Sequence, residues 1–152
     1  MFADYPVEMK PISSETDDCF AVRQAARHIS KLYERHLSKV GITPTQFSIL
    51  SVLNRNPKAT MVQLADALVM DRTTLVRVLK PLFRDGLVLA PAEERRNRRL
   101  RLMLTVKGYE RLERAIAHWR AAQADFEVVF GRQQAMHLRN ELFRITRDVP
   151  TA

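Results

Sequence analysis

Three observations predict a mainly α-helical fold that carries a single two-stranded β hairpin. The chain of 152 residues has only four glycines, whereas folds built from many tight turns need glycine often. Apolar residues recur at helical spacing over most of residues 17–148, and each such segment opens with a capping residue. Only residues 87–90 and 99–104 read as strands, and in the second Leu100, Leu102 and Leu104 alternate with Arg99, Arg101 and Met103.

The first helix is expected to begin at Asp17 or Asp18, since either carboxylate can cap it, and to end at Gly41. Its apolar stripe comprises Phe20, Ala25, Ile29, Leu32, Tyr33, His36, Leu37 and Val40. Residues 1–16 contain two prolines and little periodicity, which predicts a flexible N-terminal segment.

Two further helices begin with capping boxes. Thr43 caps the second helix, with Pro44 at its first position and Gln46 completing the box. Thr60 and Gln63 form the same box for a short third helix. The second helix is expected to stop before the proline at position 57. The expected inward residues are Phe47, Ile49, Leu50, Val52 and Leu53 on the second helix and Val62, Leu64, Ala65 and Leu68 on the third.

The fourth helix follows within about three residues, capped by Asp71, and runs from Arg72 to about Arg84. Pro81 lies inside it and is expected to bend its last turn, because proline removes a backbone hydrogen bond. Its predicted buried side comprises Leu75, Val78, Leu79, Leu82 and Phe83.

The hairpin leads into two C-terminal helices. Thr105 is placed to cap a long helix that ends near Phe130, Gly131 breaks it, and a last helix is expected over 132–148. The resulting division is a flexible N-terminal segment at 1–16, a helix at 17–42, a winged helix-turn-helix lobe at 43–104 and C-terminal helices at 105–152.

Positive charge is concentrated in the fourth helix and the hairpin. Residues 72–101 hold nine Lys and Arg against three acids, whereas the whole chain has a net charge of +8. This is the electrostatic footprint of a protein that binds phosphates. For each residue the alternative is a role without DNA binding, because charged helix faces are often only solvated and basic hairpins can pair with acidic helices.

A helix-turn-helix followed by a basic hairpin suits double-stranded DNA, because a helix fits the major groove and guanidinium groups fit a narrow, A·T-rich minor groove. The hairpin tip carries five arginines within residues 95–101. The candidate DNA-binding residues are Arg72, Thr73, Thr74, Arg77 and Lys80 on the helix and Arg95, Arg96 and Arg98 on the hairpin.

Other classes are disfavoured by what the sequence lacks. No apolar run approaches the roughly 18–20 residues of a membrane span, and the N-terminus does not resemble a signal peptide. A single cysteine excludes an intrachain disulfide, and the four histidines have no metal-ligand spacing. We therefore expect a cytoplasmic protein without metal or cofactor that is not an enzyme. A module that uses this fold only for protein contacts remains a rival interpretation.

Three segments resemble the MarR family of bacterial transcription regulators. They read ITPTQFSILSVL (42–53), QLADALVMDRTTLVRVLKPLFRDGLV (63–88) and ERRNRRLRLMLTVKG (94–108). The resemblance implies a homodimeric repressor whose first, fifth and sixth helices interleave and whose two lobes grip a pseudo-palindromic operator. It also implies that Arg72, Thr73, Thr74 and Arg77 occupy recognition-helix positions, and Arg96 and Arg98 wing-tip positions. Glu94 departs from the family, which more often has aspartate there.

Family members often bind a small, anionic, aromatic effector between the dimer helices and the lobe, and the resemblance implies the same here. The candidate contacts are His28, Lys31, Tyr33, Arg35, Phe47 and His118, although each is also a plausible packing residue. Trp119 is expected to pack in the dimer helices. The alternative regulator is redox: Cys19 lies at the start of the first helix, where a helix N-terminus favours a thiolate. The adjacent Asp17 and Asp18 oppose that effect.

Overall fold

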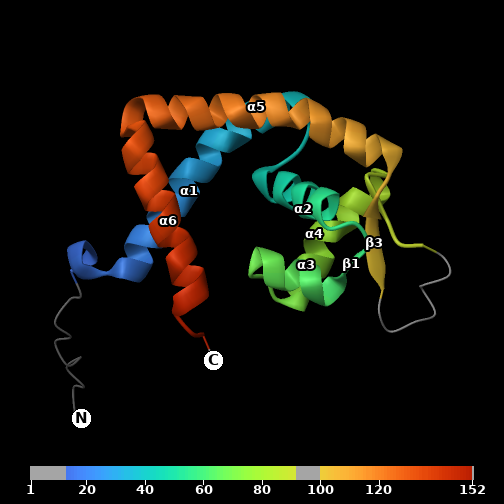
Figure 1. Ribbon diagram of the computed structural model, residues 1–152, viewed down its shortest axis with the longest axis horizontal. Coiled ribbons are helices and arrows are strands. Elements are labelled where there is room, and N and C mark those ends of the chain that lie inside the picture. Colours follow the sequence, from blue (N-terminus) through green and yellow to red (C-terminus); the bar gives the residue numbers. More distant parts are fainter. Residues whose placement is uncertain (1–12, 92–99, 152) are drawn as a thin grey trace, which may run out of the picture.

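The computed structural model describes residues 13–91 and 100–151 and is mainly helical, as predicted (Figure 1). Its α-helices are α1 (Asp18–Leu37), α2 (Pro44–Arg55), α3 (Met61–Leu68), α4 (Arg72–Arg84), α5 (Val106–Phe130) and α6 (Arg132–Asp148). Two short 3-10 helices, η1 (Ser14–Thr16) and η2 (Ser38–Val40), flank α1. The strands are β1 (Ala59–Thr60), β2 (Val88–Leu89) and β3 (Arg101–Leu104). Of the N-terminal segment that was expected to be flexible, residues 1–12 lie outside the described residues.

Two regions share α5 (Figure 1). Helices α2, α3 and α4 and the strands lie beneath one end of α5 and form what we call the lobe. The other end of α5, helix α1 and all of α6 form what we call the arm. None of the described helices is long and apolar enough to cross a membrane.

The predicted helix ends are confirmed by their caps. The Asp17 carboxylate accepts from the Phe20 amide, which makes it the N-cap of α1. Complete capping boxes start α2 at Thr43 and α3 at Thr60. Gly41 ends η2 with φ 72°, in the left-handed region. Pro81 lies within α4, and the helix continues to Arg84.

The sheet has one strand more than predicted. Strand β3 pairs antiparallel with β2, as expected of the hairpin, and also with β1, in the order β1-β3-β2. Ala59 stands opposite Leu102 and Thr60 opposite Arg101. Strand β1 is two residues long, too short to show an alternating pattern, and its partner is about forty residues away in the sequence. The pairing therefore depends on tertiary structure.

The lobe has a continuous apolar core. Leu50 of α2, Leu64 of α3, Leu79 of α4 and Leu102 of β3 are all fully or almost fully buried. Val62 was predicted to face inward, and this was wrong: its side chain is 68% exposed. The capping box puts Val62 in the first turn of α3, where the core is covered by its neighbours Met61 and Leu64.

The start of α5 is joined closely to the base of the hairpin. The Thr105 hydroxyl donates to the Gly86 carbonyl and accepts from the Gly108 amide. The Lys107 ammonium donates to the Asp85 carbonyl at 2.9 Å. A Cβ at Gly108 would collide with the Leu87 carbonyl, so glycine permits this close approach.

The arm is held by polar contacts between its helices. His36 of α1 and Asp125 of α5 form a 2.8 Å contact. At the turn into α6, Glu127 receives Arg139 at 3.4 Å and Arg132 at 3.6 Å. Gly131, with φ 97°, allows the turn. The apolar stripe predicted for the first helix is confirmed except at its start: Phe20 and Ala25 are exposed, whereas Leu37 is buried and the other five residues are partly buried.

Candidate nucleic-acid interface

The N-terminus of α4 is ordered by Asp71. Its carboxylate accepts from the Thr74 amide at 2.7 Å and from the Thr74 hydroxyl at 3.0 Å. The bond from the Thr74 amide, more than any other contact, lowers the pKa of Asp71, and the nearby Arg77 charge adds to this effect. The result is a capped helix start whose first turns face solvent.

The predicted helix residues lie together on this surface. Arg72, Thr73, Arg77 and Lys80 are exposed and Thr74 is half-buried. Asp71, Thr73, Thr74 and Arg77 line a shallow hollow of about 360 Å³. Among the described residues, no carboxylate forms an ion pair with Arg72, Arg77 or Lys80.

The turn before α4 is strained. Val69 closes α3 in the left-handed region, with φ 51° and ψ 48°. A β-branched residue is disfavoured there, and its side chain is 73% exposed, so packing does not explain the choice. The turn sets the angle between α3 and α4 and therefore the orientation of the exposed face of α4.

The hairpin tip lies outside the described residues, and with it Arg95, Arg96 and Arg98. The structure describes the base of the hairpin, β2 and β3, where Leu102 is buried and Arg101 is exposed. The tip therefore begins and ends next to strands that are packed into the lobe.

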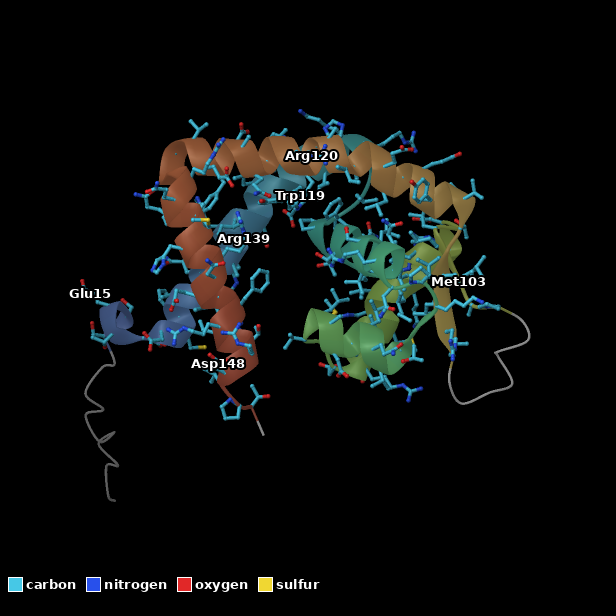
Figure 2. The ribbon with its side chains drawn as sticks, viewed as in Figure 1. Glu15, Met103, Trp119, Arg120, Arg139 and Asp148 are labelled. Atoms are coloured by element: carbon cyan, nitrogen blue, oxygen red, sulfur yellow. The ribbon has the colours of Figure 1, made fainter. Side chains whose placement is uncertain are left out.

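The predicted effector residues fall into two groups. Tyr33 and Phe47 contact Trp119, with ring centroids 6.2 Å and 5.8 Å away. Trp119 lies on the side of α5 that faces α1 and α2, with Arg120 next along the helix (Figure 2). Trp119 of α5 thus packs against α1 and also against α2, so it joins the arm to the lobe. Burial is the main cause that raises the pKa of the Tyr33 phenol.

His28 and Lys31 lie elsewhere. With Arg35 they line a cavity of about 640 Å³ between α1 and the end of α5, whose apolar walls include Phe126 and Phe130. The structure therefore does not bring the six candidates into one pocket. His118 is half-buried on α5 and lines none of the cavities described here.

A cleft between α1, α2 and α4 was missed by the sequence reasoning. Its volume is about 390 Å³. Its lining residues are Ser30, Glu34, Thr43, Pro44, Thr45, Gln46, Arg77, Val78 and Pro81. No local pattern could have indicated it, because the three helices meet only in the folded chain.

Cys19 is exposed in the first turn of α1. The chain has no other cysteine that could form a disulfide with it, and Asp17 and Asp18 precede it directly. These features do not favour the redox interpretation. Within the described part of the chain, no group of three or more His, Cys, Asp or Glu could hold a metal ion.

Comparison with known proteins identifies the family. A family model described as MarR family matches residues 40–99. The transcriptional regulator MosR of M. tuberculosis is 33% identical, with a TM-score of 0.76 over 89% of this chain and 96% of MosR. This chain belongs to the MarR family.

Two further relatives of this MarR family member are informative. The transcriptional repressor CouR, solved with p-coumaroyl-CoA, is 27% identical over 93% of this chain and 99% of CouR, with a TM-score of 0.80. SarZ, a transcriptional regulator of Staphylococcus epidermidis, is 29% identical over 59% of this chain. The match spans 61% of SarZ. MosR has also been solved in complex with DNA, and CouR on a 23-mer duplex.

Proposed function

We propose that this protein is a sequence-specific DNA-binding transcriptional repressor and not an enzyme. The observation that carries the proposal is the exposed face of α4, where Arg72, Arg77 and Lys80 stand beside Thr73 without described ion-pair partners. Arginine can bridge the O6 and N7 atoms of guanine, and threonine can contact a thymine methyl. Because its partner is genomic DNA, we place the protein in the cytoplasm.

Arginine and lysine substitutions on α4 test this proposal. The operator is first selected from genomic fragments with the purified protein, and affinities are then measured by fluorescence anisotropy. Arg77→Ala should weaken operator binding by about 1–3 kcal/mol and relax base preference if Arg77 reads a base. Lys80→Ala should reduce affinity for all sequences and make its salt dependence shallower. Arg120→Ala, on α5, is the matched control. Equal affinities for all four proteins would contradict the proposal.

We further propose that Arg95, Arg96 and Arg98 enter the minor groove beside the half-site read by α4. Narrow A·T-rich minor grooves attract arginine by their stronger negative potential. Arg96→Ala or Arg98→Ala should therefore weaken binding most on operators with A·T-rich flanks. The same loss on G·C-rich flanks would argue against groove insertion.

We propose that the protein binds DNA as a homodimer. The arm exposes apolar side chains that a folded monomer would bury: Val128 is 84% exposed, Val129 89% and Phe143 63%. Two-fold symmetry would place two α4 helices about one DNA turn apart, roughly 10–10.5 bp between half-site centres.

Sedimentation of two matched variants tests the dimer. Val129→Asp puts a charge on the arm and should shift the protein to monomer, with loss of operator binding. Val62→Asp, on the similarly exposed Val62 of the lobe, should remain dimeric. Dimers of equal stability in both variants would refute the arm as the interface.

We propose that a small anionic aromatic effector releases the operator, as the p-coumaroyl-CoA complex of CouR suggests. Two regions offer candidate contacts: the Tyr33, Phe47 and Trp119 cluster, and the cavity lined by His28 and Lys31. In an effector-release assay, Phe47→Ala tests the aromatic cluster and Lys31→Ala tests the cavity, so the two variants distinguish the two regions.

A further inference from the structure

An apolar groove lies at the base of the hairpin, beside the last turn of α4 and strand β2. Its volume is about 610 Å³. The apolar side chains that line it are Phe83, Val88, Leu89, Ala90 and Leu100. Phe83 and Leu89 are each 39% exposed, although both are large and apolar. The fold of one chain therefore leaves apolar surface open at this place.

The groove suits neither DNA nor a small polar ligand. None of the described residues that line it is charged, so they offer no cation to a phosphate. The hydroxyl of Thr105, which also lines the groove, already donates to the Gly86 carbonyl and accepts from the Gly108 amide. Ligand sites combine apolar walls with a few polar groups that orient the ligand. A second apolar surface fits this groove better.

The groove lies at the end of the molecule that is remote from the arm. Figure 1 shows the hairpin strands and the arm at opposite ends of the long axis. In the homodimer that we propose, the arms meet at the centre, so each groove lies at an outer end of the dimer. Two dimers on neighbouring operators, bound to the same face of the duplex, would bring one groove of each dimer together.

The rim of the groove is self-complementary in charge. Arg84 and Asp85 directly follow Phe83 and form a 3.0 Å ion pair, with their side chains 74% and 44% exposed. Two identical two-fold symmetric dimers on one duplex are related by a further two-fold axis between them, so the patch of one dimer meets the same patch of the other. Each copy then presents one cation and one anion to the same pair in the other copy.

We propose that two dimers bind neighbouring operators cooperatively through this groove. Phe83 and Leu89 of one dimer pack on the same residues of the next, and Arg84 of each lies opposite Asp85 of the other. The proposal goes beyond the proposed function and rests on it for the dimer and for DNA binding. The duplex holds the two patches at a high effective concentration, so even a small contact area adds to the affinity for the second site.

DNA that carries two operators tests the cooperativity by quantitative footprinting. The operator centres are placed two to four helical turns apart, roughly 20–42 bp, in steps of one base pair. Occupation of one operator should raise the affinity of the other about tenfold or more, at spacings that recur every 10–10.5 bp or so. The recurrence is expected because both dimers must lie on the same face of the duplex.

A double variant, Phe83→Gln with Leu89→Thr, tests the groove as the contact. Both changes are neutral in charge and suit a helix and a strand, so binding to a single operator should equal that of wild type. The cooperativity should be lost. Val62→Gln, at an exposed valine elsewhere in the lobe, is the matched control and should keep it. Independent binding by wild type at every spacing, or full cooperativity in the double variant, would overturn the proposal.

Cross-linking separates the failure of this proposal from the failure of the proposed function. Leu89→Cys is made in a Cys19→Ser background, so that its thiol is the only one in the chain, and is treated with a short bis-maleimide at high protein concentration. Covalently joined pairs of chains should form, whereas Val62→Cys in the same background should give none. If no operator is bound but the pairs form, the proposed function fails and the contact stands. If the pairs form neither in free protein nor on two-operator DNA, the contact is refuted.

Discussion

The lobe and the arm differ in how much of their apolar surface is buried within one chain. In the lobe, Leu50, Leu64, Leu75, Leu79 and Leu82 are almost fully enclosed by other parts of the same chain. In the arm, large apolar side chains face outward from the end of α5 and along α6. They are Val128, Val129, Phe130, Met136, Leu142, Phe143 and Ile145.

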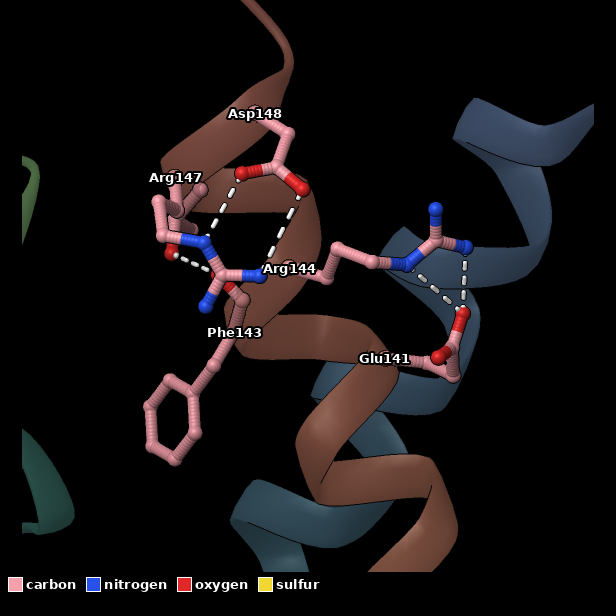
Figure 3. A network of polar contacts seen from close by, with 6 residues as sticks. Glu141, Phe143, Arg144, Arg147 and Asp148 are labelled. Carbon is pink, nitrogen blue, oxygen red and sulfur yellow. Dashed lines mark hydrogen bonds and ion pairs between the residues drawn. The ribbon is translucent and has the colours of Figure 1, made fainter.

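The charged residues of α6 follow the same division. Arg144 pairs with Glu141 and Arg147 with Asp148, both within the helix, while the Phe143 ring points away from the Glu141 pair (Figure 3). These charged side chains are thus paired within the helix, whereas the apolar side chains of the arm remain exposed. The lobe therefore completes its apolar core within one chain, whereas the arm leaves apolar side chains exposed, and we propose that a second copy covers them.

The largest expected effect is a truncation in the lobe. Leu50→Ala removes a fully buried side chain and should lower the free energy of unfolding by about 2–5 kcal/mol, because a cavity is left. Urea unfolding should give this loss at every protein concentration. A loss that varied with concentration would mean that the lobe also depends on the partner.

An arm truncation should behave in the opposite way. Phe143→Ser removes a ring that is 63% exposed in one chain, so the isolated chain should lose little stability. If the ring is buried by a second copy, the dimer should lose about 1.5–3 kcal/mol. The melting temperature of wild type should rise with concentration, and that of Phe143→Ser should rise from a lower value. Concentration-independent melting of both proteins would break the comparison.

A smaller, stabilising effect is expected at the turn of the lobe. Val69→Gly removes the left-handed strain, about 1–2 kcal/mol, against a glycine entropy cost of about 0.5–1 kcal/mol. The net gain should be roughly 0.5–1 kcal/mol in urea unfolding. Val62→Gly is the matched control, an equally exposed valine in helical conformation, and should lose stability. A loss in both would show that Val69 is held by contacts and not strained.

The smallest effect concerns acid pH. The folded-state pKa of Asp71 lies below its ordinary value of 3.8, chiefly because of the Thr74 amide. A lowered carboxyl pKa stabilises the folded state above the ordinary value and loses this contribution as pH falls through the folded pKa. Asp71→Asn should therefore show a slightly flatter decline in stability below about pH 4 than wild type. Asp66→Asn, on the exposed side of α3, is the control, and equal declines in all three proteins would contradict this role of Asp71.

The sequence was sufficient for the helices because their ends are encoded locally. Asp17, Thr43, Thr60, Asp71 and Thr105 each cap a helix where expected. Exposure was less predictable. A periodic stripe identifies an apolar face but not what covers it, so the stripes of α1 and α6 gave no sign that one chain leaves them partly open.

The recognition residues of α4 could be proposed from charge and spacing, since they lie within one short segment. The candidate effector residues could not be assigned to pockets from the sequence. Tyr33 and Lys31 are only two positions apart, but they face different neighbours. The cleft that Arg77 and Glu34 both line arises where three helices meet and has no counterpart in local sequence.

The junction at the base of the hairpin has a mechanical consequence. Helix α5 spans 25 residues, about 37 Å at 1.5 Å per residue, and continues from the arm to Thr105 as one rod. Its bonded start beside Gly86 and Leu87 fixes it to the hairpin. In the homodimer that we propose, a tilt of about 5° between the two α5 helices would move each hairpin base by about 3 Å. The spacing of the two hairpins would then depend on the angle between the two chains.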